Sequence, residues 1–418
     1  MKQAFPRPSF RLAQATVAAA LVAVATVAAT VAATSGPPAV AQTARPPRLV
    51  AIGDVHGDLD AFVGILRRAG LIDTMNRWSG QRTTLVQTGD FVDRGPQVRE
   101  VMDLLMALES QAAAAGGRVI TLLGNHEAMN LVGELRDFSP AAYASFATSS
   151  SDQLQAAAYD EVVKLARRRG GSAQAAAYKL PPRDEWMAAH PPGYLEYREA
   201  LSPRGSYGQW LRRRPAVAQV DDTIFVHGGL QPELSPKKLD DLTEQLRRQI
   251  DDFDRAVGLL VRHGAALPFF TLQEFFDAAR QQLERAAAAG EGSVATPVSV
   301  LAPEELSLVQ RGLLRIGSTH LLNPNGPLWF RGYATWRTAE ADEHLPSMLE
   351  RYGASRFVVG HTIMSSMRVT SRFSGRVVLI DTGMLSSYYK GGRAAAIEVR
   401  GDTVSAIYEE GVTTPSGG

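Results

Sequence analysis

Short apolar runs that end in a glycine next to Asp, Asn or His recur along this chain. The polar residues that follow such runs are Asp54, Asp90, Asn125, His227 and His361. In open α/β sheets, ligands gather outside the carboxyl ends of the strands, so side chains far apart in sequence can converge there. Glycine lets the backbone turn sharply and approach a bound group. The pattern predicts a polar site at the strand ends of an α/β fold.

The first third of the chain alternates between expected strands and expected helices. The pattern predicts a strand, a helix, a strand, a helix and a strand at 48–53, 58–69, 83–88, 97–115 and 118–123. This alternation indicates a largely parallel α/β core. The core is expected to resume with strands at 223–226, 356–359 and 376–380, and with a hairpin at 394–399 and 404–408.

Two later stretches interrupt this rhythm. Residues 133–215 and 231–324 are rich in Ala, Gln, Arg and Glu, and they have helical spacing without clear strand signals. We interpret both as mostly helical insertions in one catalytic domain that spans residues 48–410. Residues 411–418 are expected to be a disordered tail.

The N-terminus has the order of a secretory signal. Three basic residues precede an uncharged stretch, 12–34, and Ala39-Val40-Ala41 supplies a small-x-small cleavage pattern. We expect a signal peptide at 1–41 and a linker at 42–47, and therefore a periplasmic or secreted protein. The alternative is an uncleaved segment that anchors the protein in the inner membrane, because the apolar run could span the bilayer.

Charge and cysteine content exclude several classes of partner and chemistry. The chain has 44 Lys and Arg against 43 Asp and Glu, so its overall field does not favour nucleic acid as a partner. A membrane surface is expected as a partner only if the N-terminal segment stays attached. Because there is no cysteine, disulfides, thiolate metal sites and a cysteine nucleophile are excluded.

The residue types at the strand ends suit two metal ions. They offer carboxylate, amide and imidazole groups without sulfur: Asp54, His56, Asp90, Asn125, His227 and His361. Such ligands suit manganese, iron, zinc or cobalt, and we favour manganese. Asp90 could bridge two cations about 3.5 to 4 Å apart, which would hold a hydroxide nucleophile and neutralise a phosphoryl group.

These motifs resemble those of the phosphoprotein phosphatase branch of the calcineurin-like metallophosphoesterases. The matching motifs are GDVHG (53–57), GDFVDRG (89–95), GNHE (124–127), HGG (227–229) and GHT (360–362). In finer detail the chain is similar to the bacterial Shewanella-like protein phosphatases, through residues 326–331 and 381–384. The resemblance implies an α/β fold in which two mixed β-sheets pack as a sandwich flanked by helices.

The resemblance also implies a role for each matching residue. The first metal would be bound by Asp54, His56 and Asp90, and the second by Asp90, Asn125, His227 and His361. His126 would be the general acid, paired with Asp93. The substrate phosphate would be bound by Arg94, Asn125 and Arg331. Eukaryotic members carry a Tyr-containing loop near the site, and here residues 381–384 stand in its place.

The expected activity is two-metal-dependent hydrolysis of phosphate monoesters by direct attack of metal-bound hydroxide. Ser/Thr or Tyr phosphoproteins, phosphopeptides or small phosphoesters would be the substrates. One alternative with the same chemistry is a dinucleoside polyphosphate hydrolase or a phosphodiesterase. An alternative of another class is a non-catalytic phosphate-binding protein on a degenerate scaffold.

Overall fold

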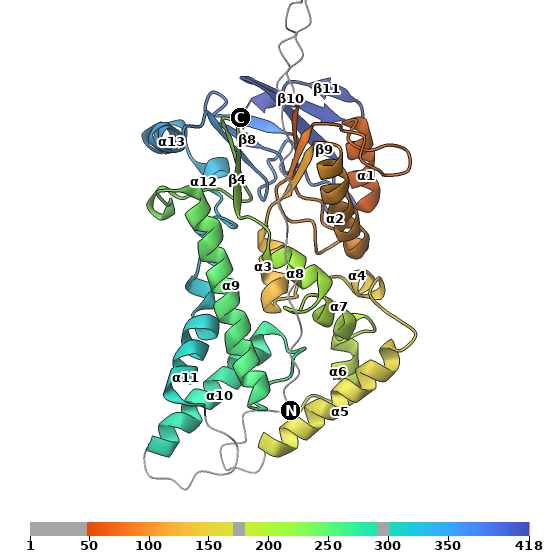
Figure 1. The fold of residues 1–418 in the computed structure, drawn as a ribbon, viewed down its shortest axis with the longest axis vertical. Coiled ribbons are helices and arrows are strands. Elements are labelled where there is room, and N and C mark those ends of the chain that lie inside the picture. Colours follow the sequence, from red (N-terminus) through yellow and green to blue (C-terminus); the bar gives the residue numbers. More distant parts are fainter. Residues whose placement is uncertain (1–47, 170–179, 291–300, 418) are drawn as a thin grey trace, which may run out of the picture. The chain divides into compact units, whose positions relative to one another are not determined.

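The structure is a computed structural model, and it describes residues 48–169, 180–290 and 301–417. The expected signal peptide (1–41) and linker (42–47) lie outside the described residues. Among the helices that are described, none is both long enough and apolar enough to cross a membrane. Figure 1 shows the arrangement of the helices and strands.

In the described part of the chain, one six-stranded sheet has the order β11-β10-β9-β1-β2-β3. Its strands are β1 (Leu49–Ile52), β2 (Thr84–Gln87), β3 (Arg118–Thr121), β9 (Ala395–Arg400), β10 (Thr403–Tyr408) and β11 (Gly411–Thr413). The strands β1, β2 and β3 run parallel, whereas β9 pairs antiparallel with β1 and with β10. The first sheet is therefore mixed.

A second sheet, also of six strands within the described residues, has the order β12-β7-β8-β6-β5-β4. Its strands are β4 (Val217–Val220), β5 (Thr223–Val226), β6 (Arg356–Val359), β7 (Thr370–Arg372), β8 (Val377–Leu379) and β12 (Ser416–Gly417). The strands β5, β6 and β8 run parallel, and β4 and β7 pair antiparallel with β5 and β8. Both sheets thus have three parallel strands next to antiparallel ones.

The two sheets pack face to face. On β1, Leu49 and Ala51 belong to an apolar layer that also contains Phe225 of the second sheet. Val50 and Ile52, on the other face of the strand, join the larger core formed with the helices. Burial on both faces explains why the strand is apolar at every position. The expected sandwich of two mixed sheets flanked by helices is confirmed.

Helices α1 (Leu59–Arg68) and α2 (Val98–Ala114) follow the first two strands, and α13 (Thr338–Tyr352) precedes β6. Helix α1 begins after Asp58, whose carboxylate accepts a hydrogen bond from the Ala61 N–H at 3.0 Å. This is an N-cap, which satisfies a donor that the first helical turn leaves unpaired. Short helices α3 (Asn125–Val132) and α12 (Gly332–Thr335) lie closer to the strand ends.

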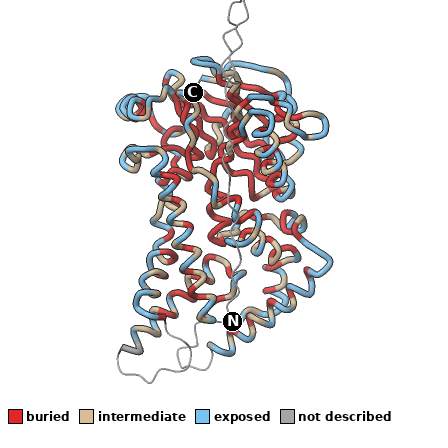
Figure 2. The backbone as a smooth tube through the Cα atoms, in the orientation of Figure 1, coloured by how far each residue is buried: buried red, intermediate tan, exposed pale blue. Residues whose placement is uncertain are grey.

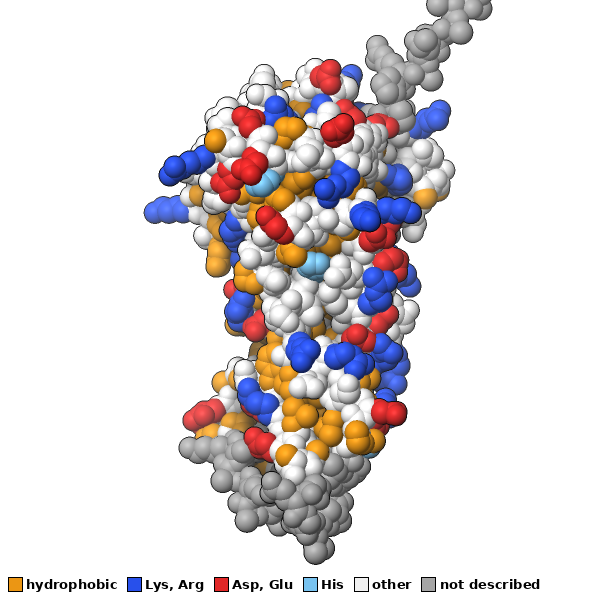
Figure 3. Space-filling view, turned by 90° about the vertical axis from the view of Figure 1, so that its left-hand side faces the viewer, with side chains coloured by type: hydrophobic (Ala, Val, Ile, Leu, Met, Phe, Trp, Pro, Cys, Tyr) orange, Lys and Arg blue, Asp and Glu red, His pale blue; other side chains and the backbone are white. Residues whose placement is uncertain are grey.

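Both interrupting stretches contain helices. The first holds α4 (Pro140–Ala144), α5 (Ser151–Arg169), α6 (Arg183–Ala189), α7 (Tyr194–Ala200) and α8 (Ser206–Arg212). The second holds α9 (Leu239–Arg262), α10 (Leu272–Gly290), α11 (Pro303–Val309) and three short turns, Pro232–Leu234, Gln310–Leu314 and Ile316–Ser318. Buried backbone is concentrated in the sheets, while the long insertion helices expose one side (Figure 2). Acidic and basic side chains are interspersed on the face in Figure 3.

The C-terminal segment differs from its prediction. We expected 411–418 to be disordered, but β11 and β12 lie within it. Strand β11 continues from β10 through a tight turn, and β12 pairs parallel with β7. The segment is short and polar, so its sequence carries no strand signal, and the exposed edges of the two sheets supply the hydrogen-bond partners.

Candidate active site

The six expected metal ligands meet at the carboxyl ends of the central strands of both sheets. All six are buried: Asp54, His56, Asp90, Asn125, His227 and His361. The backbone N–H of His361 donates to the two carboxylate oxygens of Asp54 at 3.1 and 3.2 Å. Residues from distant parts of the chain therefore form one cluster, as the strand-end pattern predicted.

Asp90 lies at the centre of this cluster. Its Oδ2 atom is 3.2 Å from His227 Nε2, 3.8 Å from His126 Nε2 and 4.0 Å from His56 Nε2. Two groups of potential ligands, each with atoms within 4.8 Å of one another, share Asp90: it joins His56 and His126 in one, and His227 and His361 in the other. This is the position that a ligand bridging two ions requires.

Three of the histidines have one ring nitrogen fixed by a backbone carbonyl. The pairs are His56 Nδ1 with Val92 O at 3.0 Å, His227 Nδ1 with Thr88 O at 2.9 Å, and His361 Nε2 with Trp329 O at 3.0 Å. A nitrogen next to a carbonyl oxygen must donate, so in a neutral ring the other nitrogen is free to bind a metal ion. Such anchoring is typical of metal-binding histidines. Burial also lowers the pKa of His56 and His361 well below the ordinary value, which keeps both rings neutral.

Three potential metal-binding atoms converge on one point of the cluster. His227 Nε2 lies 2.9 Å from Asn125 Oδ1 and 3.2 Å from Asp90 Oδ2. The contact of His227 Nδ1 with the Thr88 carbonyl directs Nε2 at these two oxygens. This donor set fits a divalent cation, with nitrogen and oxygen ligands as expected.

A further buried carboxylate, Asp381, lies next to the cluster, and the sequence analysis did not predict it as part of the site. Asp381 follows β8 and is buried next to Asp54. Burial and the charges of Asp381 and Asp90 raise the pKa of Asp54 well above the ordinary value, and burial raises the pKa of Asp381 to about 6. Burial also opposes the charge on Asp90, but neighbouring histidines, above all His227, hold its pKa well below the ordinary value. Bound cations would relieve the repulsion among these carboxylates.

Five residues of the site have left-handed backbone conformations although none is glycine. Their φ angles are 47° for His56, 57° for Asp90, 69° for Asp93, 67° for Arg94 and 64° for His361. Each such residue costs on the order of 1–3 kcal/mol and persists only where surrounding contacts hold it. Strain of this kind concentrates at functional sites, so the backbone supports the same location as the side chains.

Two glycines give the carboxylates room. A Cβ atom at Gly124 would lie 2.3 Å from Asp90 Oδ1, and one at Gly360 would lie 2.3 Å from Asp54 Oδ1. Any side chain at either position would displace a carboxylate. The glycines that precede Asn125 and His361 are therefore required by close approach.

His126 and Asp93 form the expected pair. His126 Nδ1 lies 2.5 Å from Asp93 Oδ2, and Asn130 Nδ2 donates to Asp93 Oδ1 and to the His126 carbonyl, both at 2.8 Å. Asp93 is fully buried and is held at both oxygens. The imidazole is thus fixed in orientation, with Nε2 left to face the cavity.

Neighbouring charges favour the protonated form of His126. Burial lowers its pKa, but Asp90 and Asp93 outweigh this effect, and the pKa is raised above the ordinary value. An imidazolium that is held by a carboxylate can donate a proton, as a general acid must. Asp137, which was not predicted, adds a carboxylate oxygen 3.9 Å from His126 Nδ1.

Arg94 lies beside the cluster with an unsatisfied donor. Its guanidinium contacts His56 Nε2 and the Tyr389 hydroxyl, and its Nη2 is 2.9 Å from His126 Nε2. The rings of Tyr388 and Tyr389 lie 5.2 and 5.4 Å from Arg94 Cζ. Among the described residues, the buried Nε of Arg94 has no partner. A buried donor without a partner suits a ligand anion such as a phosphate oxygen.

Tyr389 is a residue of the cavity that the sequence analysis did not predict. The sequence resemblance placed residues 381–384 where eukaryotic members have a Tyr-containing loop. In the structure the loop after β8 continues to Tyr389, which reaches Arg94 and lines the cavity. No local sequence signal marked this tyrosine, because its contact partner lies 295 residues away.

Arg331 lines the same cavity as Arg94. Its Nη1 donates to the His361 carbonyl at 3.1 Å and to Thr362 Oγ1 at 3.0 Å. The cavity has a volume of about 360 Å³, and its lining includes Asp54, Asp90, Arg94, Asn125, His126, Asp137, Arg331, His361 and Tyr389. The two expected phosphate-binding arginines therefore face one space.

Glu127 is the last residue of the GNHE motif, and no role was predicted for it. It is fully buried, and its carboxylate accepts hydrogen bonds from the backbone N–H groups of Asp90, Phe91, Val92 and Gly124 at 2.8 to 3.1 Å. It fixes the loops after β2 and β3 to each other. Burial raises its pKa to about 7. Glu127 therefore positions ligands without facing the cavity.

Comparisons with known proteins agree with this geometry. The model of the calcineurin-like phosphoesterase family matches residues 47–267, more than half of the 418-residue chain. Shewanella-like protein phosphatase 2 of Arabidopsis thaliana is 34% identical over 221 residues, which are 50% of this chain and 53% of that protein. The chain thus matches about half the length of this relative.

Two further similarities extend over more of the chain. Shewanella-like protein phosphatase 1 of Plasmodium berghei is 24% identical over 340 residues, covering 81% of this chain and 67% of that protein. The crystal structure of a cold-active protein-tyrosine phosphatase of Shewanella sp. covers 88% of this chain and 80% of its own, with a TM-score of 0.53 and 23% identity, which shows a shared fold. With its metal-ligand cluster at the strand ends and its match over 47–267, the chain belongs to the calcineurin-like phosphoesterase family.

Proposed function

We propose that this protein is a metal-dependent phosphatase that hydrolyses phosphate monoesters on proteins or peptides. The observation that carries the proposal is the shared cavity. Metal-binding carboxylate, amide and imidazole groups, a histidine whose pKa is raised and two arginines all line it. This combination supplies cation binding, a proton for the leaving group and binding of the phosphoryl oxygens.

The metal ligands would divide as the sequence indicates. Asp54, His56 and Asp90 would hold one divalent cation, and Asp90, Asn125, His227 and His361 the other. Bound there, the two cations supply Lewis acidity that activates water and neutralises phosphoryl charge. Nitrogen and oxygen ligands suit manganese, iron, zinc or cobalt, and we favour manganese.

The remaining groups act on the substrate directly. Arg94 binds a phosphoryl oxygen through its fork of donors, and Arg331, which lines the same cavity, can bind another. The Asn125 amide group lies at the same point and contributes to phosphate binding. His126 gives the proton on Nε2 to the leaving oxygen, and Asp93 holds the imidazole in that orientation.

The class of substrate rests on the relatives. The two proteins from Arabidopsis and Plasmodium are both named protein phosphatases, which supports a phosphorylated protein or peptide as the substrate. The mutual repulsion within an intact ligand set argues against a degenerate, non-catalytic scaffold. Nucleic acid is not favoured, because acidic and basic residues nearly balance.

The decisive assay compares substrates and metals together. Protein stripped of metal and reloaded with manganese, cobalt, zinc or iron is tested on p-nitrophenyl phosphate, bis(p-nitrophenyl) phosphate, diadenosine tetraphosphate and phosphopeptides. We expect metal-dependent turnover of the monoesters. Absence of any metal-dependent hydrolysis would overturn the proposal, and a strong preference for diadenosine tetraphosphate would replace it with a dinucleoside polyphosphate hydrolase.

We also propose that the protein is exported and that the segment 1–41 is removed. The support is the order of basic residues, apolar run and small-x-small pattern at the N-terminus. Cell fractionation followed by N-terminal sequencing tests this proposal. A mature chain that starts at Gln42 in the periplasmic or secreted fraction is expected, whereas an intact N-terminus in the inner membrane would show the anchored alternative.

A further inference from the structure

A second cavity adjoins the active-site cavity. It also has a volume of about 360 Å³, and Arg136 lines both cavities. Its walls come from the segment after α3, from α6 and α7, and from the beginning of α10. Both helical insertions therefore contribute to it, and it shares Arg136 with the cavity in which the phosphate is expected.

The floor of this cavity is aromatic. Phe138, Tyr143 and Tyr194 line it, and all three are buried. The ring centroids of Phe138 and Tyr143 are 4.5 Å apart, and those of Tyr143 and Tyr194 are 5.5 Å apart. The hydroxyl of Tyr194 donates to the Phe269 carbonyl at 2.9 Å, so this hydroxyl needs no hydrogen bond from a ligand. An apolar ligand group could pack on these rings.

Hydrogen bonds between the two insertions hold the cavity in shape. The Leu272 N–H donates to the Gly133 carbonyl at 3.0 Å, and Arg198 Nη2 donates to the Phe270 carbonyl at 3.0 Å. These contacts join the start of α10 to the end of α3 and to α7. A cavity that is formed in advance binds its ligand without the entropic cost of ordering its walls.

A chain of contacts connects the cavity floor to Asp93, the partner of the proposed general acid His126. The ring of Phe138 stacks on Tyr197 with centroids 4.0 Å apart, and Tyr197 donates its hydroxyl hydrogen to Asn130 Oδ1 at 2.7 Å. Asn130 in turn donates to Asp93, the partner of His126. The cavity and the acid thus keep a fixed relation to each other.

We propose that this second cavity receives an apolar side chain of a phosphopeptide, a few residues from the phosphorylated one. The inference rests on the proposed function and narrows its substrate class. The phosphorylated residue would occupy the active-site cavity, and the peptide would pass the exposed Arg136 to reach the aromatic floor. A small phosphoester would occupy only the first cavity.

The test uses short phosphopeptides in which one leucine is moved through each position on either side of the phosphorylated residue, with glycine or serine elsewhere. Series with phosphotyrosine and phosphoserine are run in parallel with p-nitrophenyl phosphate. At one position leucine should raise kcat/KM about tenfold or more over glycine, because the cavity buries it. If no position of leucine matters although peptides are hydrolysed, the inference is wrong.

A variant that fills the cavity gives the second arm of the test. Ala189 is the exposed last residue of α6 and lines the cavity, whereas Ala114 is the exposed last residue of α2 and does not. Ala189→Trp should abolish the leucine preference and leave turnover of p-nitrophenyl phosphate within about twofold. Ala114→Trp should change neither.

The outcomes separate the two proposals. If the wild-type protein does not hydrolyse p-nitrophenyl phosphate, the proposed function itself is wrong. A leucine preference that survives in Ala189→Trp would overturn the cavity as its cause while leaving the phosphatase intact. Should Ala189→Trp fail to fold, Ala189→Glu places a charge at the same position, and it should reduce the same preference.

Discussion

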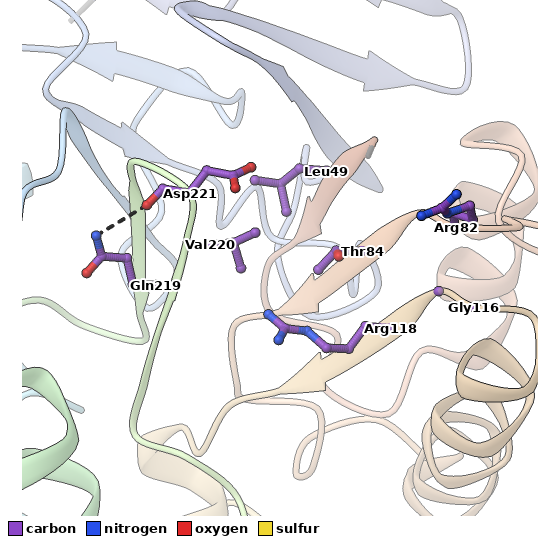
Figure 4. A pocket seen from close by; sticks show the side chains of 9 residues that line it. Leu49, Arg82, Thr84, Gly116, Arg118, Gln219, Val220 and Asp221 are labelled. Atoms are coloured by element: carbon purple, nitrogen blue, oxygen red, sulfur yellow. Dashed lines mark hydrogen bonds between the residues drawn. The ribbon is translucent and has the colours of Figure 1, made fainter. Parts of the chain in front are cut away.

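Charged side chains are buried together at the carboxyl ends of the central strands, whereas they are exposed at the amino ends of the same strands. At the carboxyl ends, acids and imidazoles are buried against one another in a cavity of about 360 Å³. At the amino ends, β1 begins at Leu49 and β2 begins at Thr84. A larger cavity of about 510 Å³ there is lined by Arg82, Arg118 and Asp221, among other residues (Figure 4). These three charged side chains are exposed to water.

The contrast shows that cavity size does not identify the site. Water already solvates the arginines at the amino ends, and Figure 4 shows them spread around the space rather than meeting at one point. At the carboxyl ends, burial removes water, so the groups there perturb one another strongly. A metal ion binds well where several potential ligands meet at one point and water does not already solvate them.

The largest expected effect is the loss of the bridging carboxylate. Asp90→Asn should lower kcat/KM for p-nitrophenyl phosphate by roughly a thousandfold or more, because it weakens both cation sites and the charge stabilisation they give. Metal analysis of the purified variant should show reduced metal content. Arg118→Ala at the other end of the strands is the control and should keep full metal content. Normal turnover in Asp90→Asn would remove Asp90 from the site.

Loss of His126, the proposed general acid, should slow hydrolysis most for substrates with poor leaving groups. His126→Ala is expected to slow hydrolysis of phenyl phosphate by about a hundredfold or more. The loss on p-nitrophenyl phosphate should be smaller, because its leaving oxygen needs less protonation. Equal losses on the two substrates would indicate that His126 does not deliver the proton.

The hydroxyl of Tyr389 should have a moderate effect. Tyr389→Phe removes the contact to Arg94 and keeps the ring, so KM should rise by about fivefold with little change in kcat. The matched control is Tyr388→Phe, since Tyr388 approaches Arg94 only through its ring. A Tyr388→Phe variant that behaves like Tyr389→Phe would show that the hydroxyl contact is not the cause.

The buried carboxylates predict how stability depends on pH in metal-free protein. Asp381 has a pKa of about 6 in the folded protein against an ordinary value of 3.8, and the pKa of Asp54 is raised as well. These carboxylates therefore bind more protons in the folded state than in the unfolded state, so their contribution to stability should fall as pH rises from about 4 to about 7. The lowered pKa values of His56 and His361 act in the opposite direction.

Thermal denaturation of the metal-free wild type and of Asp381→Asn across this range isolates the fall that Asp381 causes. The stability of the variant should fall less, or rise more, with pH than that of the wild type, because the group that must lose a proton is gone. Metal-loaded protein should show little fall, since cations favour the deprotonated carboxylates. Identical pH profiles for the metal-free wild type and Asp381→Asn would show that deprotonation of Asp381 does not cause the fall.

The smallest effect is expected at the amino ends. Arg82→Glu and Arg118→Glu, alone or together, should change kcat/KM for small monoesters by less than about twofold and leave the melting temperature nearly unchanged. Steady-state kinetics and thermal denaturation measure both. A large loss of activity would show that charge at this end reaches the catalytic site, and the contrast between the two ends of the strands would fail.

Much of the fold could be predicted because the central strands are short apolar runs that end in glycine. Strands β5 and β6 have the predicted bounds, and most of the others agree to within a residue or two. Strands β4, β7, β11 and β12 were missed. Strand β11 is an edge strand of the first sheet, and the other three lie at or near the edges of the second. Strands β4 and β7 each have a single buried position and are otherwise half-buried or exposed. Their pairing depends on the neighbouring strand more than on their own residues.

By itself, the sequence predicted the expected ligand set, the His126–Asp93 pair and Arg94, because each lies within a short motif at the end of a strand, and the structure brings these residues together. Only the tertiary structure decided that Asp381 presses on Asp54, that Tyr389 holds Arg94 and that Glu127 fixes two loops. It also placed an aromatic cavity from both insertions beside the phosphate site. Such features depend on burial and on contacts between distant segments, which local patterns of residues do not encode.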